Sequence, residues 1–466
     1  MLNIILYQLL KAHRDIWPNK IAIKSNNFEI TYKELLSIIQ NMAHALYFKN
    51  IFEGLVIVLG EMNEYDFIIY TLVFLSMGCW IVPDPDDQAE VVFHKNNCKI
   101  DMKINRENKN QESLPQINKE QLIEIDTYLN KCESGGLYHM TSGTTGESKI
   151  CVRDIYTLMF EAENFIYHYN LSSNDIITSF CSLWHSFAFG GCLMTFFKLG
   201  CTICLIKNLS YQDAIKFIED QTVTMILAVP FIVKMLNILR LQQSIKLSNV
   251  KTFLVGAGKL DKNQYFTFYK KYGVYLLSNY GSTETGAVLS RVNHRTYSSV
   301  GVPMKNVEVK IIDKQGKESN KGLLFVKSKS MMKCYYNMKS CFDQNGFYNT
   351  GDIVIVRQGY YYIVGRQKLF INIAGKKINP EEIETIICEL SNVNECVVAC
   401  VKSALVENNI IAYVVMASGE ELNTEKIRNY CKQKLKPHQV PMYYQNVAQI
   451  HKDAQGKIKR SFYFYK

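Results

Sequence analysis

Short apolar runs alternate with segments of helix length over the first two thirds of the chain, and this alternation predicts strands and helices in turn. Near the N-terminus the pattern predicts a strand at residues 54–60, a helix at 65–77 and a second strand at 80–82. Further strand-like runs lie at residues 201–206, 224–229 and 252–255. Strands that alternate with helices are typical of a largely parallel sheet, whose ligands bind at loops beyond the strand ends. We therefore expect an α/β fold for this part of the chain.

The pattern changes after residue 301, where shorter strand-like runs joined by turns predict a β-rich subdomain. These runs lie at residues 307–313, 322–328, 352–358 and 360–365. Beyond Arg366 helix and strand alternate again in a piece of about domain size. In this last piece we expect helices at residues 380–390 and 424–435.

The chain divides into units of unequal size. Its 466 residues are too many for one core, and a prior of about 150 residues per domain suggests roughly three units. We place a domain boundary at residues 365–368, which leaves 1–364 as a large N-terminal domain and 369–466 as a small C-terminal domain. Residues 84–136 are polar and rich in Asn, Lys and Gln, so we expect little secondary structure there.

The composition is that of a globular protein in a reducing compartment. Hydrophobic residues make up 48% of the chain and charged residues 21%, the proportions of a soluble protein. No stretch reaches the ~18 apolar residues of a membrane span, and the N-terminal LNIILYQLL lacks a basic leader and a cleavage site. Most of the 14 cysteines lie in apolar runs, as expected of buried, reduced thiols. We expect a cytoplasmic protein.

The single CxxC and the positive net charge do not by themselves indicate a metal site or nucleic-acid binding. Cys201 and Cys204 form one CxxC, but no second CxxC or His pair follows at zinc spacing, so we interpret both as core residues. The net charge is +10, and no basic stripe interleaved with aromatics predicts nucleic-acid binding. Half of that net charge falls between Arg366 and Lys466, where it could face an anionic partner or form a solvated basic surface.

The segment 138–149, YHMTSGTTGESK, combines hydroxyls, glycines and a lysine at a density that suits phosphate binding. Its glycines can adopt backbone angles closed to other residues, so that consecutive amides turn toward an anion. The spacing is not the GxxxxGK[ST] of the common P-loop, and on its own the segment could be a surface turn. The candidate phosphate ligands are Thr141, Ser142, Gly143, Thr144, Thr145, Gly146 and Lys149.

A second candidate segment, SNYGSTETG, lies at residues 278–286. The aromatic face of Tyr280 can stack on a purine. The carboxylate of Glu284 suits Mg²⁺, which takes a few oxygen ligands together with substrate phosphates. The segment therefore predicts the base and metal side of a nucleotide site.

Three shorter segments follow in order. GFYNTGD at residues 346–352 ends in Asp352, whose carboxylate can accept both hydroxyls of a ribose. GRQK at 365–368 and GKIKR at 456–460 follow it. Each segment alone is weak evidence, because such turns are often only surface, and their order along the chain is the stronger signal.

Taken in order, these five segments resemble those of the adenylate-forming enzymes: acyl-CoA synthetases, adenylation domains of peptide synthetases, and luciferases. The resemblance extends over nearly the whole chain, including EITYKELL at 29–36 and VPFIVKML at 229–236. It implies a large N-terminal domain of two α/β subdomains plus a β-rich subdomain, and a small mobile α+β C-terminal domain with its hinge at 365–368. The implied reaction has two halves. A carboxylate attacks the α-phosphorus of ATP to give acyl-AMP and pyrophosphate, and a thiol then displaces AMP.

The resemblance implies how the phosphates are held. Residues 141–149 wrap the leaving β,γ-phosphates, and this loop should be mobile enough to release pyrophosphate before the thiol arrives. Thr283 and Glu284 hold the α-phosphate side and Mg²⁺. Lys457 bridges the substrate carboxylate and the α-phosphate, where a fixed ammonium stabilises the charge that builds in the transition state.

The resemblance also implies how the nucleoside is held. Tyr280 stacks on adenine, and Asp352 and Arg366 bind the ribose. A strand end resembling the family's adenine edge, and the residues around Tyr280, complete the nucleotide-binding set: Gly256, Ala257, Gly258, Asn279, Gly281 and Ser282.

The identity of the acid depends on the segment SLWHSFAFGG at residues 182–191. Family members that activate amino acids carry an aspartate here for the substrate ammonium. No carboxylate occurs in this chain, and burying an ammonium without a partner costs several kcal/mol, so a free α-amino acid is disfavoured. His185 resembles the histidine that lies near the carboxylate in acyl- and aryl-CoA synthetases, although packing against aromatics would also explain it. The aromatic neighbours favour a small apolar acyl or aryl acid.

The thiol acceptor is predicted from the hinge. Lys368 stands where many members have Asp, and a lysine there is familiar among CoA ligases. Pro380, in GKKINPEEIE, is likewise found in acyl- and aryl-CoA synthetases. CoA is therefore the leading acceptor, and the phosphopantetheine of an acyl carrier protein, whose acidic surface would suit the basic C-terminal region, is the alternative. A catalytically inactive nucleotide-binding scaffold or sensor is disfavoured, because Glu284, Asp352 and Lys457 are all present.

Overall fold

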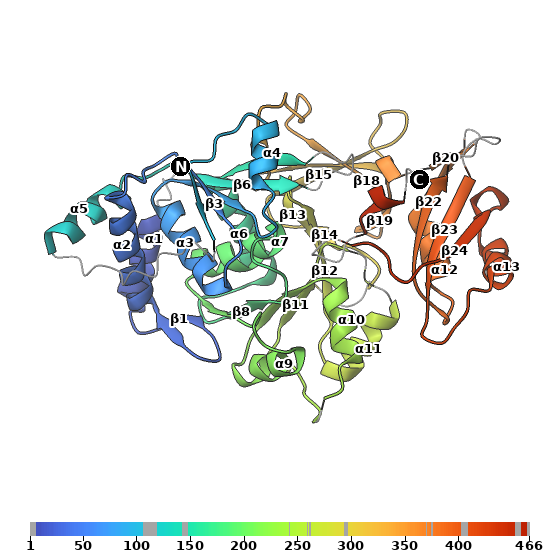
Figure 1. Ribbon diagram of the computed structural model, residues 1–466, viewed down its shortest axis with the longest axis horizontal. Coiled ribbons are helices and arrows are strands. Elements are labelled where there is room, and N and C mark those ends of the chain that lie inside the picture. The colour runs from blue at the N-terminus through green and yellow to red at the C-terminus, as the bar shows by residue number, and fades with distance from the viewer. Residues whose placement is uncertain are drawn as a thin grey trace. The chain divides into compact units, whose positions relative to one another are not determined.

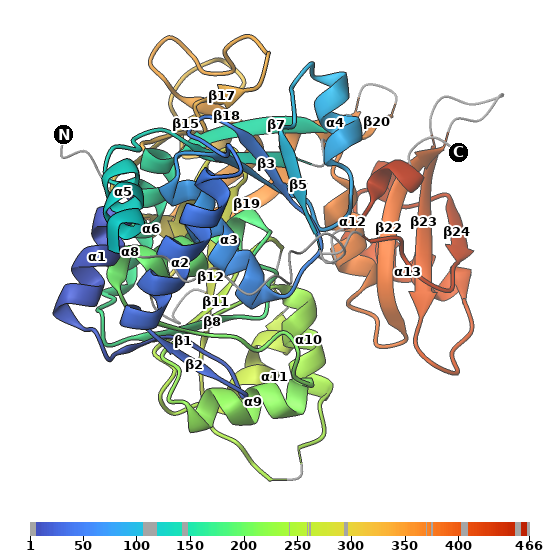
Figure 2. The same ribbon diagram turned by 60° about the vertical axis from the view of Figure 1, so that its left-hand side comes forward.

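The computed structural model of the chain is shown from two sides in Figures 1 and 2. It describes residues 6–105, 119–141, 148–241, 243–258, 260, 262–292, 297–369, 371–373, 376–401, 409–452 and 458–463. The chain forms two compact units. The first comprises Met1–Ser142, Ser148–Val309 and Val326–Tyr348, and the second comprises Gly143–Glu147, Lys310–Phe325 and Asn349–Lys466.

A six-stranded sheet forms one layer of the first unit. Its spatial order is β17 (Cys334–Tyr335), β7 (Lys149–Asp154), β6 (Gly136–Thr141), β4 (Trp80–Pro83), β3 (Val56–Leu59) and β5 (Met102–Ile104). Strands β6, β4, β3 and β5 run parallel, whereas β7 and β17 are antiparallel additions at one edge. The parallel part confirms the sheet expected from alternating strands and helices.

A nine-stranded sheet forms the second layer. Its order is β14 (Val302–Pro303), β13 (Gly286–Ser290), β12 (Leu276–Ser282), β11 (Thr252–Val255), β10 (Met225–Ala228), β8 (Ile176–Ser179), β9 (Thr202–Cys204), β1 (Ile21–Lys24) and β2 (Glu29–Thr31). The strands from β12 to β1 pair in parallel, and antiparallel strands close both edges.

One apolar core lies between the inner faces of the two sheets. Figure 1 shows α6 and α7 between the sheets, with α9–α11 beyond the nine-stranded one. The helical segments that contribute to the shared core are α1 (Leu6–Ile16), α2 (Tyr32–Tyr47), α3 (Glu64–Ser76), α5 (Lys119–Leu129), α6 (Ile155–Tyr169), α7 (Ser186–Ala188), the π-helix η1 (Phe189–Met194) and α8 (Thr195–Leu199).

Separate apolar clusters cover the outer faces. Helices α9 (Tyr211–Asp220), α10 (Pro230–Ile238) and α11 (Lys262–Tyr272) pack on the outer face of the nine-stranded sheet. Helix α4 (Ala89–Lys95) packs on the outer face of the six-stranded sheet. In the part of the chain that the structure describes, no helix has both the length and the apolar character needed to cross a bilayer.

The central strands are continuous apolar runs in the sequence because both of their faces are buried. Successive residues of a strand point to opposite faces. In β10, Met225 and Leu227 belong to the core between the sheets, while Ile226 and Ala228 face α10 and α11. A central parallel strand therefore needs apolar residues at every position rather than at alternate ones.

Most of the expected elements occur close to their expected bounds, and one expectation was wrong. The runs at 54–60, 224–229 and 252–255 contain β3, β10 and β11, β4 extends the run at 80–82 by one residue, and the helix expected at 65–77 is α3. Cys201 and Cys204 are buried in the core, as expected. The polar stretch 84–136, however, contains α4, β5 and α5. Helix α5 packs on the shared core through Ile125 and Leu129, and its Asp126 accepts hydrogen bonds from Tyr7 and Lys11 of α1 at 2.6 and 3.0 Å.

The second unit is richer in strands. A four-stranded sheet, ordered β15 (Val307–Ile312), β16 (Lys321–Ser328), β18 (Tyr348–Arg357) and β19 (Tyr360–Arg366), contributes residues to it. It is followed by the 3-10 turn η2 (Gln367–Leu369) and a hairpin of β20 (Ile371–Ile373) and β21 (Lys376–Ile378). The β-rich pattern expected after residue 301 is therefore confirmed.

A small α+β fold makes up the rest of the second unit. Its sheet is β22 (Val393–Val401), β23 (Asn409–Met416) and β24 (Tyr443–Asn446), and the remaining 3-10 turns are η3 (Pro437–Gln439) and η4 (Arg460–Phe462). Helices α12 (Pro380–Ile387) and α13 (Thr424–Lys434) pack on one face. Ile450 and Tyr463 pack on the other face. Both helices lie within the ranges expected from the sequence.

A fully buried ion pair joins three elements of the first unit. Arg153 of β7 and Glu161 of α6 lie 2.7 Å apart, with side chains only 1% and 2% exposed. The Arg153 guanidinium also donates a hydrogen bond to the Ser330 carbonyl oxygen at 2.7 Å. The Glu161 carboxylate accepts one from the Ala287 amide of β13 at 3.0 Å. The pair therefore ties β7, α6 and β13 together where no water can replace a lost partner.

Replacing Glu161 by Gln should reduce the free energy of unfolding by about 3–5 kcal/mol, because it leaves the Arg153 cation buried without a counter-charge. The matched control is Glu163→Gln on the same helix, whose partner Lys198 lies 4.0 Å away near the surface. That control should change stability by less than about 1 kcal/mol. Urea unfolding of the three proteins measures the difference, and equal stabilities would contradict the importance of the buried pair.

A buried histidine makes the fold acid-sensitive. His139 of β6 is buried, and its Nε2 lies 2.8 Å from the Trp184 carbonyl oxygen. Burial lowers the pKa of His139 to about 4 from an ordinary value of 6.5. As the pH falls below 6.5 the unfolded chain binds a proton that the folded chain does not, so stability decreases.

As the pH falls from the pKa of His139 in the unfolded chain to its pKa in the folded chain, this one group should reduce the free energy of unfolding by about 3 kcal/mol. The variant His139→Gln keeps a side-chain donor for the Trp184 carbonyl but cannot titrate. Its stability should therefore fall less steeply than that of the unaltered protein when urea unfolding is compared at about pH 7 and about pH 4.5. His94→Gln, on the exposed side of α4, should keep the original slope. Identical slopes for all three proteins would contradict the assignment.

Candidate functional site

The centre of the candidate site is the turn between β12 and β13. The first part of β12 pairs with β11 up to Val255↔Ser278, and its later residues continue past that point to pair with β13. The turn is closed by Ser282 and Thr285, since the Ser282 amide donates to Thr285 Oγ1 at 3.1 Å. A Cβ at Gly281 would lie 2.2 Å from the Gly286 carbonyl oxygen, so only glycine fits there. This extension carries Tyr280 and Thr283 beyond the carboxyl edge of the parallel strands, where ligands bind in open α/β sheets.

Glu284, the predicted metal ligand, is held on two sides. Tyr335 donates a hydrogen bond from its hydroxyl to Glu284 Oε1 at 2.8 Å. The Met332 amide donates to the Glu284 carbonyl oxygen at 2.8 Å. The hydroxyl of Tyr348 lies 3.1 Å from that of Tyr335. Burial, and then the nearby Glu284 carboxylate, raise the pKa of Tyr335 far above its ordinary value, so its hydroxyl stays protonated and able to donate.

The predicted phosphate loop begins and ends at one point of the six-stranded sheet. Thr141 ends β6 and Lys149 begins β7, and the two residues are direct partners in the antiparallel pair. Thr141 Oγ1 donates to the Lys149 carbonyl oxygen at 3.4 Å. The Lys149 ammonium lies over the Tyr335 ring, 4.7 Å from its centre. The structure thus brings Lys149 and Glu284 to the same tyrosine.

The remaining loop candidates, Ser142, Gly143, Thr144, Thr145 and Gly146, lie outside the described residues, as does the expectation that this loop is mobile.

Ser186, which directly follows His185, brings the His185 segment into contact with Thr283. His185 caps the N-terminus of α7, and its Nδ1 accepts a hydrogen bond from the Phe187 amide at 3.3 Å. That acceptor role assigns the proton of a neutral ring to Nε2. Ser186 Oγ lies 3.3 Å from Thr283 Oγ1. Because His139 contacts the Trp184 carbonyl, the chain is also fixed just before His185.

The predicted adenine-edge segment packs against α7. A Cβ at Gly256 would meet the Phe187 ring at 2.8 Å, so the glycine leaves room for that ring. Ala257 has a left-handed backbone with φ of 61°, a conformation that costs a non-glycine residue about 1 kcal/mol or more. Gly258 lies beside Pro230, where an added Cβ would be 3.2 Å from the proline ring. Asn279 is buried, and its amide donates to the Tyr169 hydroxyl at 3.4 Å.

Other predicted residues belong to the second unit. Asp352 of β18 and Arg366 of β19 are direct partners across an antiparallel pair, and Arg366 Nε lies 3.3 Å from Asp352 Oδ1. Their side chains are 13% and 41% exposed, so the arginine is the more accessible of the two. The Asp352 amide donates to Thr350 Oγ1 at 3.1 Å. Lys368 lies in η2, and its side chain is outside the described residues.

Lys457 itself lies outside the described residues, but the chain on both sides of it is described. Lys452 and Ile458 form an isolated antiparallel bridge, and the Lys459 amide donates to the His451 carbonyl oxygen at 2.9 Å. The His451 amide in turn donates to the Tyr463 hydroxyl at 2.9 Å. Residues 452 and 458 are thus held together at the base of the segment that carries Lys457.

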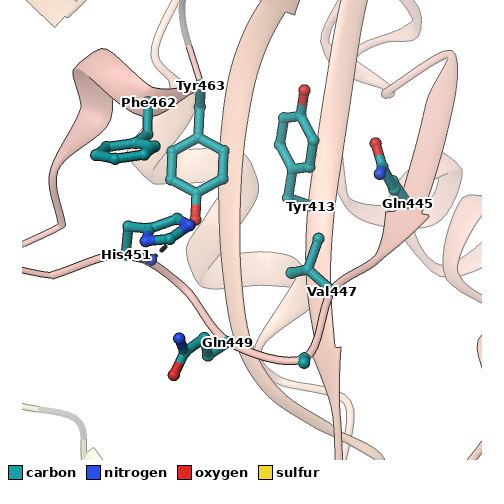
Figure 3. Close-up of a pocket in the computed structure, with 8 residues that line it drawn as sticks. Tyr413, Gln445, Val447, Gln449, His451, Phe462 and Tyr463 are labelled. Carbon is teal, nitrogen blue, oxygen red and sulfur yellow. Dashed lines mark hydrogen bonds between the residues drawn. The ribbon is translucent and has the colours of Figure 1, made fainter.

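A cavity of about 290 Å³ lies beside this base. Figure 3 shows the rings of His451 and Phe462 stacked along one wall, with Tyr463 and Tyr413 beyond them. The ring centres of His451 and Phe462 are 4.3 Å apart. None of the described candidate site residues lines this cavity. It is therefore a feature of the segment that flanks Lys457, distinct from the turn at Glu284.

Sequence reasoning missed the side chains that hold the candidate residues in place. Tyr335 belongs to no segment singled out beforehand, and Ser186 and Phe187 were noted only as neighbours of His185. The available signal was position: Ser186 and Phe187 directly follow a candidate residue on a helix of only three residues. Tyr335 gave no such signal, because it contacts Glu284 from 51 residues away in the chain.

Comparisons with known proteins agree on one family. Residues 10–336 match the AMP-binding enzyme family, and residues 382–457 match the AMP-binding enzyme C-terminal domain. Among solved structures, the O-succinylbenzoate coenzyme A synthetase of Bacillus subtilis in complex with ATP and magnesium ion has a TM-score of 0.82 at 20% identity. That similarity covers 97% of this chain and 98% of the other, and it shows a common fold.

Two curated relatives match over different lengths. The 4-coumarate–CoA ligase-like 2 of Arabidopsis thaliana is 25% identical over 348 residues, which are 71% of this chain. The chain spans only 61% of that relative. The 2-succinylbenzoate–CoA ligase of Staphylococcus epidermidis is 24% identical over 463 residues, 95% of this chain and 94% of the relative. With family matches over both regions and a fold shared along its length, the chain belongs to the AMP-binding enzyme family of adenylate-forming enzymes.

Proposed function

We propose that the protein is an ATP-dependent, AMP-forming ligase that joins a carboxylic acid to a thiol. One observation carries the proposal: the turn after β12 is in contact both with the His185 segment and with the tyrosine that meets Lys149. Thr283 lies 3.3 Å from Ser186, and Glu284 lies 2.8 Å from the Tyr335 hydroxyl. Groups predicted for the acid, the α-phosphate and the leaving phosphates are therefore linked through this one turn, which follows β12 of the nine-stranded sheet and contacts β17 of the six-stranded sheet.

The proposed first step makes an acyl-adenylate. A carboxylate oxygen of the acid forms a bond to the α-phosphorus of ATP, and the bond from that phosphorus to the pyrophosphate oxygen breaks. Negative charge spreads over the phosphoryl oxygens in such a step, so fixed donors and cations lower the barrier. We assign this role to Thr283, Lys149 and Lys457. Asp352 and Arg366 are assigned to the ribose, and Tyr280 to the adenine ring.

The donor set around Glu284 fits Mg²⁺. This ion takes one or two carboxylates and completes its shell with phosphates and water, so it does not need a cage of protein ligands. Among the described residues no group of three His, Cys, Asp or Glu side chains could form such a cage. Tyr335 occupies one oxygen of Glu284 and leaves the other for a cation. Bound there, Mg²⁺ would neutralise phosphate charge.

We further propose that the acid is apolar. Trp184 and Phe189 are buried beside His185, and the Trp184 ring stacks on Phe67 with centres 4.0 Å apart. The segment 182–191 offers no carboxylate for a substrate ammonium. The names of the two curated relatives refer to acids with an aromatic ring, which favours an aryl acid over a free amino acid.

CoA is the proposed thiol, and the phosphopantetheine of a carrier protein is the alternative. The thiol sulfur would form a bond to the acyl carbon and displace AMP. The relatives named above are CoA ligases, which supports the first choice. Thioester formation should be compared with CoA and with candidate carrier proteins. Loading of a carrier without consumption of CoA would reverse the choice.

The decisive experiment is acid-dependent exchange of labelled pyrophosphate into ATP. Purified protein should catalyse exchange with at least one member of a panel of fatty acids, benzoate and cinnamate derivatives and 2-succinylbenzoate. Amino acids should give none, because the segment 182–191 offers no carboxylate for their ammonium. Absence of exchange across the whole panel would contradict the proposed activity and favour a nucleotide-binding protein without catalysis.

Replacing Lys457 by Ala should slow acyl-adenylate formation by ~10²–10³, the scale of one donor that stabilises charge in the transition state. Thioester formation from supplied acyl-AMP should survive, because the bond between the α-phosphorus and pyrophosphate is already broken before that step begins. Lys459→Ala removes an equal charge two residues further along and serves as the control. Pyrophosphate exchange and single-turnover thioester assays separate the two steps, and equal damage to both would show that Lys457 has a different role.

A further inference from the structure

Tyr335 lies between two groups of opposite charge. Its hydroxyl donates to Glu284 Oε1 at 2.8 Å, and its ring face receives the Lys149 ammonium at 4.7 Å. Within the part of the chain that the structure describes, no direct ion pair joins Lys149 to Glu284. A tyrosine can serve both groups at once, because its hydroxyl is a donor and its ring face attracts cations.

The surroundings fix this tyrosine firmly. Tyr335 is 7% exposed, and its backbone is paired with Cys151 of β7, two residues after Lys149. The Tyr336 amide donates to the Ile150 carbonyl oxygen at 2.9 Å, which secures the strand end. Met332, three residues earlier, holds the backbone of Glu284. The same short segment therefore positions both the side chain and the backbone of Glu284.

We propose that Tyr335 is a positioning residue that keeps Lys149 and Glu284 apart, so that the ammonium remains available for the leaving phosphates and the carboxylate for Mg²⁺. The inference rests on the proposed function and deepens it. Without the hydroxyl, Glu284 would lose its fixed orientation. Without the ring as well, Lys149 and Glu284 would be free to pair directly, and each would be withdrawn from its ligand.

Two substitutions separate these effects. Tyr335→Phe removes only the hydroxyl and keeps the ring under Lys149. Tyr335→Leu removes both. The matched controls are Tyr336→Phe and Tyr336→Leu, because Tyr336 directly follows β17 and its ring packs against Tyr138, 5.7 Å away between centres.

The main readout is the dependence of ATP binding on the Mg²⁺ concentration. Calorimetry measures this binding in the absence of any acid substrate. For Tyr335→Phe we expect the half-saturating MgCl₂ concentration to rise about tenfold, the scale for losing a residue that orients a metal ligand. ATP affinity at saturating MgCl₂ should be retained. Tyr335→Leu should show the same shift and, in addition, weaker binding of inorganic pyrophosphate. Both Tyr336 variants should match the unaltered protein.

The outcomes distinguish this inference from the proposed function. If the unaltered protein binds no ATP, the proposed function fails. If it binds ATP but Tyr335→Phe shows an unchanged Mg²⁺ response, only the role of Tyr335 is overturned. Thermal unfolding of each variant shows whether it is folded. A Tyr335→Phe protein with an unchanged unfolding temperature and a shifted Mg²⁺ response establishes positioning, which a merely structural role would not produce.

Discussion

The buried ion pair between Arg153 and Glu161 constrains several elements of the first unit at once. Two charges without access to water are stable only when each has a close counter-charge, so the elements that carry these two charges are held next to each other. Glu161 lies directly beneath the turn that carries the candidate site, since a Cβ at Gly286 would approach its carboxylate to 3.0 Å. A Cβ at Gly190, in the π-helix that follows His185, would approach it to 2.3 Å. The position of the site therefore depends on charges that the proposed chemistry does not use.

The fold could be read from the sequence where burial dictates the pattern. Strand β10 is apolar at all four positions because both of its faces are covered. The elements within residues 84–136 gave no such signal. Helix α5 packs on the shared core and is also tied to α1 by the hydrogen bond between Asp126 and Tyr7, 119 residues away, and no local pattern records a contact of that separation. Periodicity predicts which side of an element is buried, but it does not identify a distant polar partner.

The candidate site likewise has some residues that a local sequence pattern indicates and others that no local pattern indicates. Glu284, Lys149 and Asp352 were proposed as candidates from the sequence because they lie in short segments dense in glycine and hydroxyls. Tyr335 was not, because nothing in the neighbouring sequence KCYYNMKS distinguishes it from an ordinary packed tyrosine. Its contact with Glu284 is visible only once β17 is paired with β7. Motifs identify the groups that touch a ligand, whereas the groups that orient them are chosen by packing and have no fixed spacing.

The division of the candidate residues between two compact units has a chemical consequence for the proposed reaction. The residues assigned to adenine, the acid and the metal belong to the first unit, and those assigned to the ribose, together with Lys457, belong to the second. Recognition of the base and the acid then depends on groups held by one rigid core. Lys457, which we propose to stabilise the transition state, belongs to the second unit, where a bridge between Lys452 and Ile458 joins the chain on its two sides. Both units therefore contribute to binding and to acceleration in the proposed reaction, since the first also holds Thr283 and Lys149 and the second holds the proposed ribose ligands. Those interactions that form only in the transition state raise the rate without tightening the ground state.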